Sequence, residues 1–306
     1  MKLKETVTAP IAVLFTYGLY FVCYASPVAS DALRRYGDYT LVSGIVMLFL
    51  TLVIPAIIYA KLKGVGYSAK MHFATLNPSR SLFALCALVC ALSGAVLFAG
   101  GANALGIERY SLVSTYTLTI ADGTLPVYYR LIAYAVIPAL AEEFLYRGIL
   151  FTEYRESGTV CAVIFSSVLF ALGQFSVNGF VAFLFLGALM AFVYYVTESF
   201  VLTVLVRVIF NSVVFFFEDA SWLLILRQTD YILFFTVCAA VFLLFAALGL
   251  SEAQRIFFRC GADGEKSPPG ASGKEKPTSA LASAVLSPTF ILCVAAAIAV
   301  NIYAFR

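Results

Sequence analysis

Six polar residues stand inside apolar segments of the sequence: Glu142, Glu143, Arg147, Gln174, Arg207 and Asn211. If those segments cross a membrane, each charge at the bilayer centre costs roughly 2.5–3.5 kcal/mol on insertion scales, so it needs a partner or a function. A carboxylate can act as a general base, and amide or guanidinium groups can stabilise an oxyanion. The set therefore indicates either a reaction centre within the membrane or a buried network that only fixes helix packing.

The spacing of the acids predicts different roles for them. Glu143 and Arg147 are four residues apart, so on a helix their side chains are neighbours and can form an ion pair. Glu142 is turned about 100° from Glu143 by the helical period. It is left to point into the bundle, to meet a cation from another helix, or to be hydrated at an interface together with Glu143.

Arg207 is the cation that can meet Glu142. It has apolar residues on both sides in the middle of its segment, so its guanidinium cannot easily reach a headgroup. Asn211 lies four residues farther on, on the same helix face. We therefore predict a buried contact between Arg207 and Glu142, with Gln174 and Asn211 completing the hydrogen bonds.

Composition identifies the elements that must position these residues. Of 306 residues, 62% are hydrophobic and only 12% are charged, about half the charge of a soluble domain. Several apolar runs approach the length of about 20 residues that a membrane-spanning helix needs, and they lack the alternation of barrel strands. The fold class is therefore an all-α, polytopic transmembrane helix bundle. We predict about nine spans, near 8–27, 40–60, 82–104, 127–151, 159–175, 178–197, 199–217, 231–250 and 286–305.

The distribution of Lys and Arg predicts the orientation. Basic residues crowd the connections 61–80 and 255–276, which the positive-inside rule places in the cytoplasm. We therefore expect a multi-pass protein of the cell membrane with a cytoplasmic amino terminus and an outside carboxyl terminus. The acidic connection 218–230 would lie outside, whereas Arg34 and Arg35 in the first outside connection oppose this orientation.

Other site types find little support. The net charge of +3 is small and its basic residues lie in connections, which does not favour nucleic-acid binding. Cys86 and Cys90 share a helix face but lack further ligands. His72, the only histidine, lies in a polar connection away from Glu142. We therefore expect no zinc site and no cofactor.

Three motifs in this sequence resemble those of the CAAX protease and bacteriocin-processing (CPBP, or Abi) family of intramembrane proteases. The family pattern is EExxxR, then FxxxH, then HxxxN or HxxxD. The corresponding segments here are Glu142-Glu143-Phe-Leu-Tyr-Arg147, Phe170-Ala-Leu-Gly-Gln174 and Arg207-Val-Ile-Phe-Asn211. The match in spacing and surrounding sequence covers about 135–217, and both motif histidines are replaced.

The resemblance implies a role for each matching residue. In the family, a glutamate activates water for peptide cleavage, with help from one histidine, and the later histidine and asparagine stabilise the oxyanion. The implied roles are general base for Glu142, structural pair for Glu143 and Arg147, and oxyanion donor for Asn211, with Gln174 and Arg207 in the histidine positions. Some members are described as metalloproteases.

The two replacements change the expected chemistry. Gln174 can orient water but cannot exchange a proton near neutral pH, so activity should fall sharply or vanish. Arg207 can stabilise an oxyanion, but it would also stabilise the ionised form of Glu142 and make it a weaker base.

The resemblance divides the chain into three regions. Residues 1–126 form amino-terminal transmembrane helices, 127–217 form the CPBP-like core in spans four to seven, and 218–306 hold the carboxyl-terminal helices. The last region contains a predicted flexible linker at 252–284, because residues 262–280 are rich in Gly, Ser, Pro and Lys.

Three functions fit these observations. The first is a degenerate protease homologue that binds a membrane protein or a hydrophobic peptide. The second is a working intramembrane glutamate endopeptidase in which Gln174 and Arg207 replace the histidines. The third is a transporter whose path is lined by the same charges, although the sequence has neither an internal repeat nor a helix broken by paired Gly or Pro.

Overall fold

The computed structural model describes residues 5–25, 45–64, 78–107, 112, 126–218, 231–262 and 277–304, and within these ranges every regular element is a helix. The predicted all-α membrane helix bundle is confirmed. By length and composition, four of the described helices can cross a membrane: Ile45–Lys63, Arg80–Ala102, Phe180–Thr197 and Ile232–Arg259. Four further apolar helices are shorter: Val7–Val22, Thr159–Gly173, Phe200–Phe216 and Pro288–Ile302. The number of nine spans stays a prediction.

The helices follow the predicted segments closely, and π-helical stretches carry the letter η. In chain order they are α1 (Glu5–Ala25), η2 (Phe49–Val53), α4 (Ile54–Lys63), α5 (Pro78–Ala104), α6 (Val127–Leu131), η5 (Ile132–Val136), α7 (Ile137–Glu143), η6 (Phe144–Phe151), α8 (Thr152–Arg155), α9 (Thr159–Gly173), α10 (Phe180–Thr197), α11 (Phe200–Glu218), α13 (Tyr231–Ala262), α14 (Pro277–Val285) and α15 (Pro288–Ala304).

Two helices occupy parts of the predicted linker 252–284. Helix α13 continues through 252–262, and α14 covers 277–285, while 263–276 lie outside the described residues. A helix does not have to end where apolar sequence ends, because charged side chains can continue it into water. Glu252 and Arg255 of α13 form such a pair at 2.7 Å.

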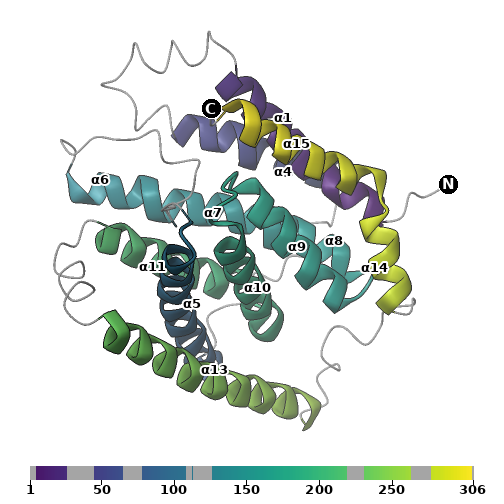
Figure 1. The fold of residues 1–306 in the computed structure, drawn as a ribbon. Coiled ribbons are helices and arrows are strands. Elements are labelled where there is room, and N and C mark those ends of the chain that lie inside the picture. The colour runs from purple at the N-terminus through teal and green to yellow at the C-terminus, as the bar shows by residue number, and fades with distance from the viewer. Residues whose placement is uncertain are drawn as a thin grey trace.

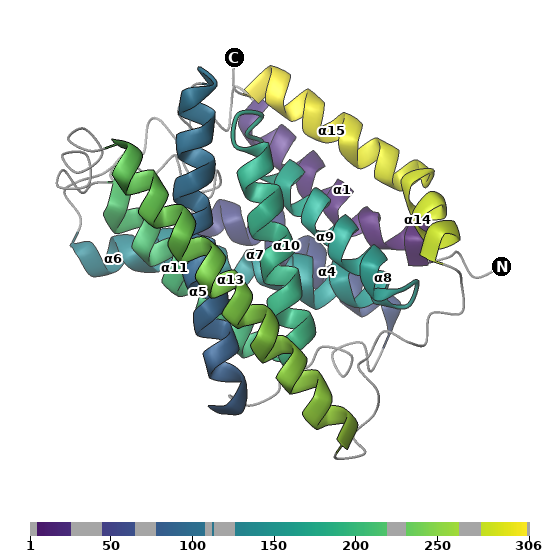
Figure 2. The same cartoon turned by 60° about the horizontal axis from the view of Figure 1, so that its bottom comes forward.

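The bundle has a central group of helices between two outer pairs. Helices α1 and α15 pack side by side on one side, and α13 crosses α5 on the other (Figures 1 and 2). Helices α7, α9, α10 and α11 lie between these pairs. The helices that carry the six polar residues are therefore in the interior of the bundle.

The five elements from α6 to α8 join into one helix that contains two π-helical stretches, η5 and η6. The π-helical stretch η5 ends directly before Ile137 and Pro138, and η2 ends in the same way before Ile54 and Pro55. Proline has no backbone N–H to donate, and its ring crowds the preceding turn. Both effects favour a wider turn directly before it. A second stretch, η6, begins directly after Glu143, so both acids lie between two π-helical stretches.

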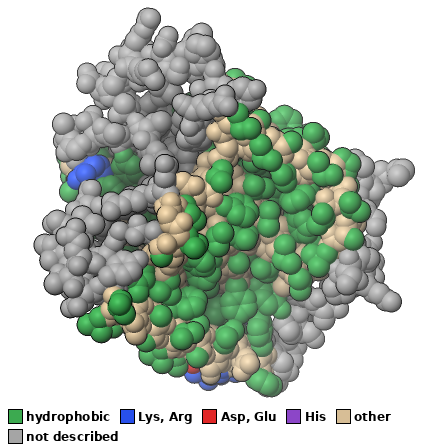
Figure 3. Space-filling view, viewed as in Figure 1, with side chains coloured by type: hydrophobic (Ala, Val, Ile, Leu, Met, Phe, Trp, Pro, Cys, Tyr) green, Lys and Arg blue, Asp and Glu red, His purple; other side chains and the backbone are tan. Residues whose placement is uncertain are grey.

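The outer surface of the described chain is apolar. Figure 3 shows hydrophobic side chains over most of the described part of one face, with a few charged side chains at the edges of that part. On α13, Leu243 is 67% exposed and Ile232 is 81% exposed. Apolar surface of this extent is stable against lipid tails, so the chain is a membrane protein whose helices contact the bilayer.

Three of the ion pairs are partly exposed. They are Lys63–Glu153 at 2.6 Å, Arg155–Glu198 at 3.0 Å and, within α13, Arg255–Glu252 at 2.7 Å. If the predicted nine spans and orientation hold, all three face the cytoplasm.

The orientation can be tested with protease-accessible tags. A tag placed within 263–276 is expected to be protected in intact cells, and tags within 219–230 or after Arg306 are expected to be cleaved by an external protease. The same tags in permeabilised cells, where all should be cleaved, provide the control. Cleavage within 263–276 in intact cells would reverse the orientation.

Candidate functional site

The structure brings the six predicted site residues into one buried region. Glu142 and Glu143 end α7, Arg147 lies in η6, Gln174 caps the end of α9, and Arg207 and Asn211 lie on α11. Five of these side chains are 0% exposed and Asn211 is 4% exposed. Charged groups at this depth are stable only with partners, which makes their contacts decisive.

The predicted contact between Glu142 and Arg207 is confirmed. Arg207 Nη2 donates to Glu142 Oε2 at 2.8 Å, and both side chains are fully buried. Gln174 Nε2 donates to the other oxygen, Glu142 Oε1, at 3.1 Å. Both carboxylate oxygens therefore accept a hydrogen bond from a buried side chain of another helix.

The predicted contribution of Asn211 to this network is wrong. Its Nδ2 donates to the backbone carbonyl of Ala135 in η5 at 3.4 Å. Asn211 lies one helical turn, about 6 Å, beyond Arg207 along α11. Because the helix from 127 to 155 runs in the opposite direction, Asn211 meets a residue that precedes Glu142 by about two turns.

The pair of Glu143 and Arg147 is present, with a second contact that the sequence did not predict. Arg147 Nε lies 3.1 Å from Glu143 Oε2, although these atoms lack hydrogen-bond alignment. The turn between them belongs to η6, whose wider winding displaces side chains from the α-helical i,i+4 register. Arg147 Nη2 donates instead to the carbonyl of Gly187 at 2.7 Å, which connects this helix to α10.

Gly187 allows α9 and α10 to approach closely beside the site. A Cβ atom at this position would lie 3.0 Å from Phe170 Cδ1, 3.1 Å from Ser167 Cα and 3.2 Å from the Ser167 carbonyl oxygen. Backbone atoms cannot move aside as a flexible side chain can. Small residues at helix contacts are typical of membrane bundles. A glycine within an apolar segment was therefore the sign in the sequence that could have indicated a close helix contact at Gly187.

Replacing Gly187 with leucine is expected to lower the free energy of unfolding by about 1–3 kcal/mol through overpacking. The matched control is Gly101→Leu on α5, where a Cβ would meet no described atom within 4 Å. Thermal unfolding in detergent should show a lower melting temperature for the Gly187 variant only. Equal losses in both variants would contradict the close packing at Gly187.

Metal ligands do not converge in the described part of the chain. No group of three or more His, Cys, Asp or Glu side chains occurs there. Cys86 and Cys90 are both buried on α5, whereas His72 lies outside the described residues. The expectation of no zinc site stays a prediction.

The geometry around Glu142 favours a fixed ion pair over a reacting base. A general base needs a water or substrate within hydrogen-bond reach and a group that can pass the proton on. Gln174 and Arg207 both donate to Glu142, and neither can accept its proton near neutral pH. The arrangement neutralises the carboxylate and joins α7, α9 and α11.

The comparisons with known proteins identify the same region. Residues 124–213 match the family model described as type II CAAX prenyl endopeptidase Rce1-like. This match confirms the resemblance to the CPBP family over the helices from α6 to α11. No curated protein and no solved structure matches the chain.

Proposed function

We propose that this chain is a CAAX-protease-like membrane protein in which the family's catalytic glutamate has become one half of a structural ion pair. On this proposal it does not cleave peptides. It acts by binding a membrane protein or a hydrophobic peptide through the helices that surround the former reaction centre. Its location in the cell membrane with a cytoplasmic amino terminus is part of the same proposal.

The engagement of Glu142 supports this proposal most strongly. The side chain is 0% exposed, and its two oxygens accept bonds from Gln174 and Arg207. Releasing the carboxylate for catalysis would leave the Arg207 cation buried without its anion, which costs several kcal/mol. That cost opposes the formation of a free, hydrated base.

A working glutamate endopeptidase is the second candidate. The match of residues 124–213 to a CAAX prenyl endopeptidase family favours it. The Arg207 cation and the Asn211 amide, at the positions of the family's oxyanion donors, favour it as well. In this alternative, Glu142 would leave Arg207 when substrate enters. Arg207 would then be free to stabilise the oxyanion.

A cleavage assay separates the two candidates. The purified protein is reconstituted in liposomes with a library of prenylated and unprenylated peptides, beside Glu142→Gln, which keeps the size of the side chain. We expect the products of the two proteins to be indistinguishable. Cleavage that disappears in a folded Glu142→Gln variant would establish the endopeptidase instead.

Binding is measured on the same samples. A peptide that binds only the folded protein raises the melting temperature as its concentration increases, because binding is coupled to folding. We expect at least one peptide class to stabilise the wild-type protein without being cleaved. If no peptide shifts the melting temperature, the proposed partner is a membrane protein.

A further inference from the structure

The ring of Phe170 lies beside both buried arginines. The guanidinium carbons of Arg147 and Arg207 are each 5.0 Å from its centroid. Arg147 comes from η6, Arg207 from α11 and Phe170 from α9, so one ring connects three elements. The two cations can be no farther apart than twice that distance, in a region with no exposed surface.

The carboxylates of Glu142 and Glu143 balance the charges of the two arginines, but they leave several arginine nitrogens without a hydrogen-bond acceptor. Each arginine has only one side-chain hydrogen bond, because Nε and Nη1 of Arg147 and of Arg207 have no hydrogen-bond partner among the described residues. The face of an aromatic ring carries negative charge density and attracts cations within about 6 Å of its centroid. This attraction is strongest where water is absent, because no solvent competes with the ring.

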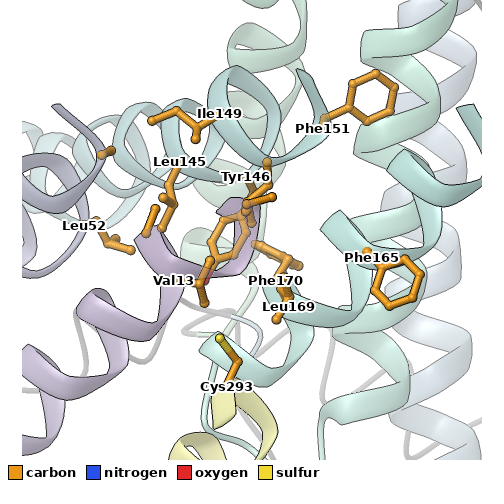
Figure 4. Packing of buried hydrophobic residues seen from close by; sticks show 14 of the residues in the cluster. Val13, Leu52, Leu145, Tyr146, Ile149, Phe151, Phe165, Leu169, Phe170 and Cys293 are labelled. Atoms are coloured by element: carbon orange, nitrogen blue, oxygen red, sulfur yellow. The ribbon is translucent and has the colours of Figure 1, made fainter. Parts of the chain in front are cut away.

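The surroundings of Phe170 fix the position of its ring. Tyr146 packs edge-on against it with ring centroids 5.3 Å apart, and Phe183 of α10 does so at 6.4 Å. Gly187 leaves room for the ring, since a Cβ there would lie 3.0 Å from Phe170 Cδ1. Figure 4 shows Tyr146 and Phe170 close together in the same packed region. A ring held on several sides can orient flexible arginine side chains.

We propose that Phe170 is a positioning residue that holds Arg147 and Arg207 by cation–π attraction and thereby keeps Arg207 aligned with Glu142. Phe170 is the ring that both arginines share, and Phe210 lies beside Arg207 alone, with its centroid 5.6 Å from the guanidinium carbon. The role belongs to this chain in particular, because Arg207 stands where the family has a histidine. It does not depend on whether the chain cleaves peptides.

A fluorination series tests the proposal without changing the packing greatly. Phenylalanine with one, two or three fluorine atoms replaces Phe170, because each fluorine withdraws negative charge from the ring face. We expect the melting temperature in detergent to fall stepwise, by about 3 °C over the whole series. Phe183 provides the matched control, since it is also fully buried and has no cation over its ring among the described residues.

A spectroscopic measurement adds a second readout. The N–H protons of Arg147 and Arg207 should show ring-current shifts in NMR spectra, and Phe170→Leu should remove them while Phe183→Leu should not. A stepwise fall at Phe170 alone, with these shifts, supports the proposal. Equal responses at the two positions, or no response at Phe170, would overturn it.

Discussion

Replacing Arg207 with alanine is expected to lower the free energy of unfolding by about 3–5 kcal/mol, because the change leaves the Glu142 carboxylate buried without its cation. The two side chains are fully buried and 2.8 Å apart, so water cannot replace the lost partner without opening the bundle. In a membrane the loss is expected near the lower end of this range. Steric trapping in bicelles would measure it directly.

Removing both partners is expected to cost less than removing Arg207 alone. In the double variant Glu142→Ala and Arg207→Ala, no unpaired charge remains, so part of the stability should return. The double-mutant cycle should therefore give a coupling free energy of about 0.5–3 kcal/mol. Additive losses would mean that the pair contributes nothing beyond its separate side chains.

Arg255→Ala is the matched control for this cycle. Arg255 also forms an ion pair, with Glu252 at 2.7 Å, but its side chain is 44% exposed. Surface pairs usually contribute about 0–1 kcal/mol, because solvent screens them. Stability should thus fall much less for this variant than for Arg207→Ala. A loss as large as that at Arg207 would show that burial does not explain the effect.

The Glu142–Arg207 contact could be predicted from the sequence because a buried charge without a partner is energetically unfavourable. A cation in the middle of an apolar segment requires an anion, and Glu142 was the acid left after Glu143 paired with Arg147. The same reasoning identified Gln174, which lies at the end of α9 at the depth of the acids. Few arrangements satisfy so many buried charges, so residue types and helical periodicity were sufficient.

Contacts with the backbone could not be predicted in this way. Asn211 bonds to the Ala135 carbonyl and Arg147 bonds to the Gly187 carbonyl. Every residue carries a carbonyl, so the sequence does not distinguish one acceptor from another. Which of them is within reach depends on the crossing of helices and on the π-helical turns, which shift side chains away from the α-helical register.

The position of Phe170 illustrates a second limit. Its motif marked the residue, but no periodicity rule places one ring beside two cations from two other helices.

Helix α13 illustrates a third limit of prediction from sequence, because it continues to Ala262, beyond the apolar segment that ends near residue 250. Hydropathy predicts where the membrane-spanning part of a helix ends, but the helix itself can continue beyond that point.

Restoring both family histidines is expected to produce cleavage that depends on Glu142. In the double variant Gln174→His and Arg207→His, the cation that neutralises Glu142 is gone, and a group that can exchange protons stands beside the carboxylate. Proton transfer by a positioned side chain typically contributes about 10²–10⁴-fold to a rate, which a peptide-library assay in liposomes would detect. The wild-type protein is the baseline for this comparison.

Two further variants make the result specific to the proposed cause. Gln174→His alone keeps the Glu142–Arg207 pair and is expected to remain inactive, because the carboxylate is still neutralised. Adding Glu142→Gln to the double variant should abolish whatever cleavage appears, since glutamine cannot act as the base.

If the double variant folds with a melting temperature close to that of the wild type and cleaves nothing, the two replaced histidines are not what separates this chain from an active protease. Cleavage by Gln174→His alone would instead show that Glu142 can act as a base while Arg207 is present, which would favour the working endopeptidase.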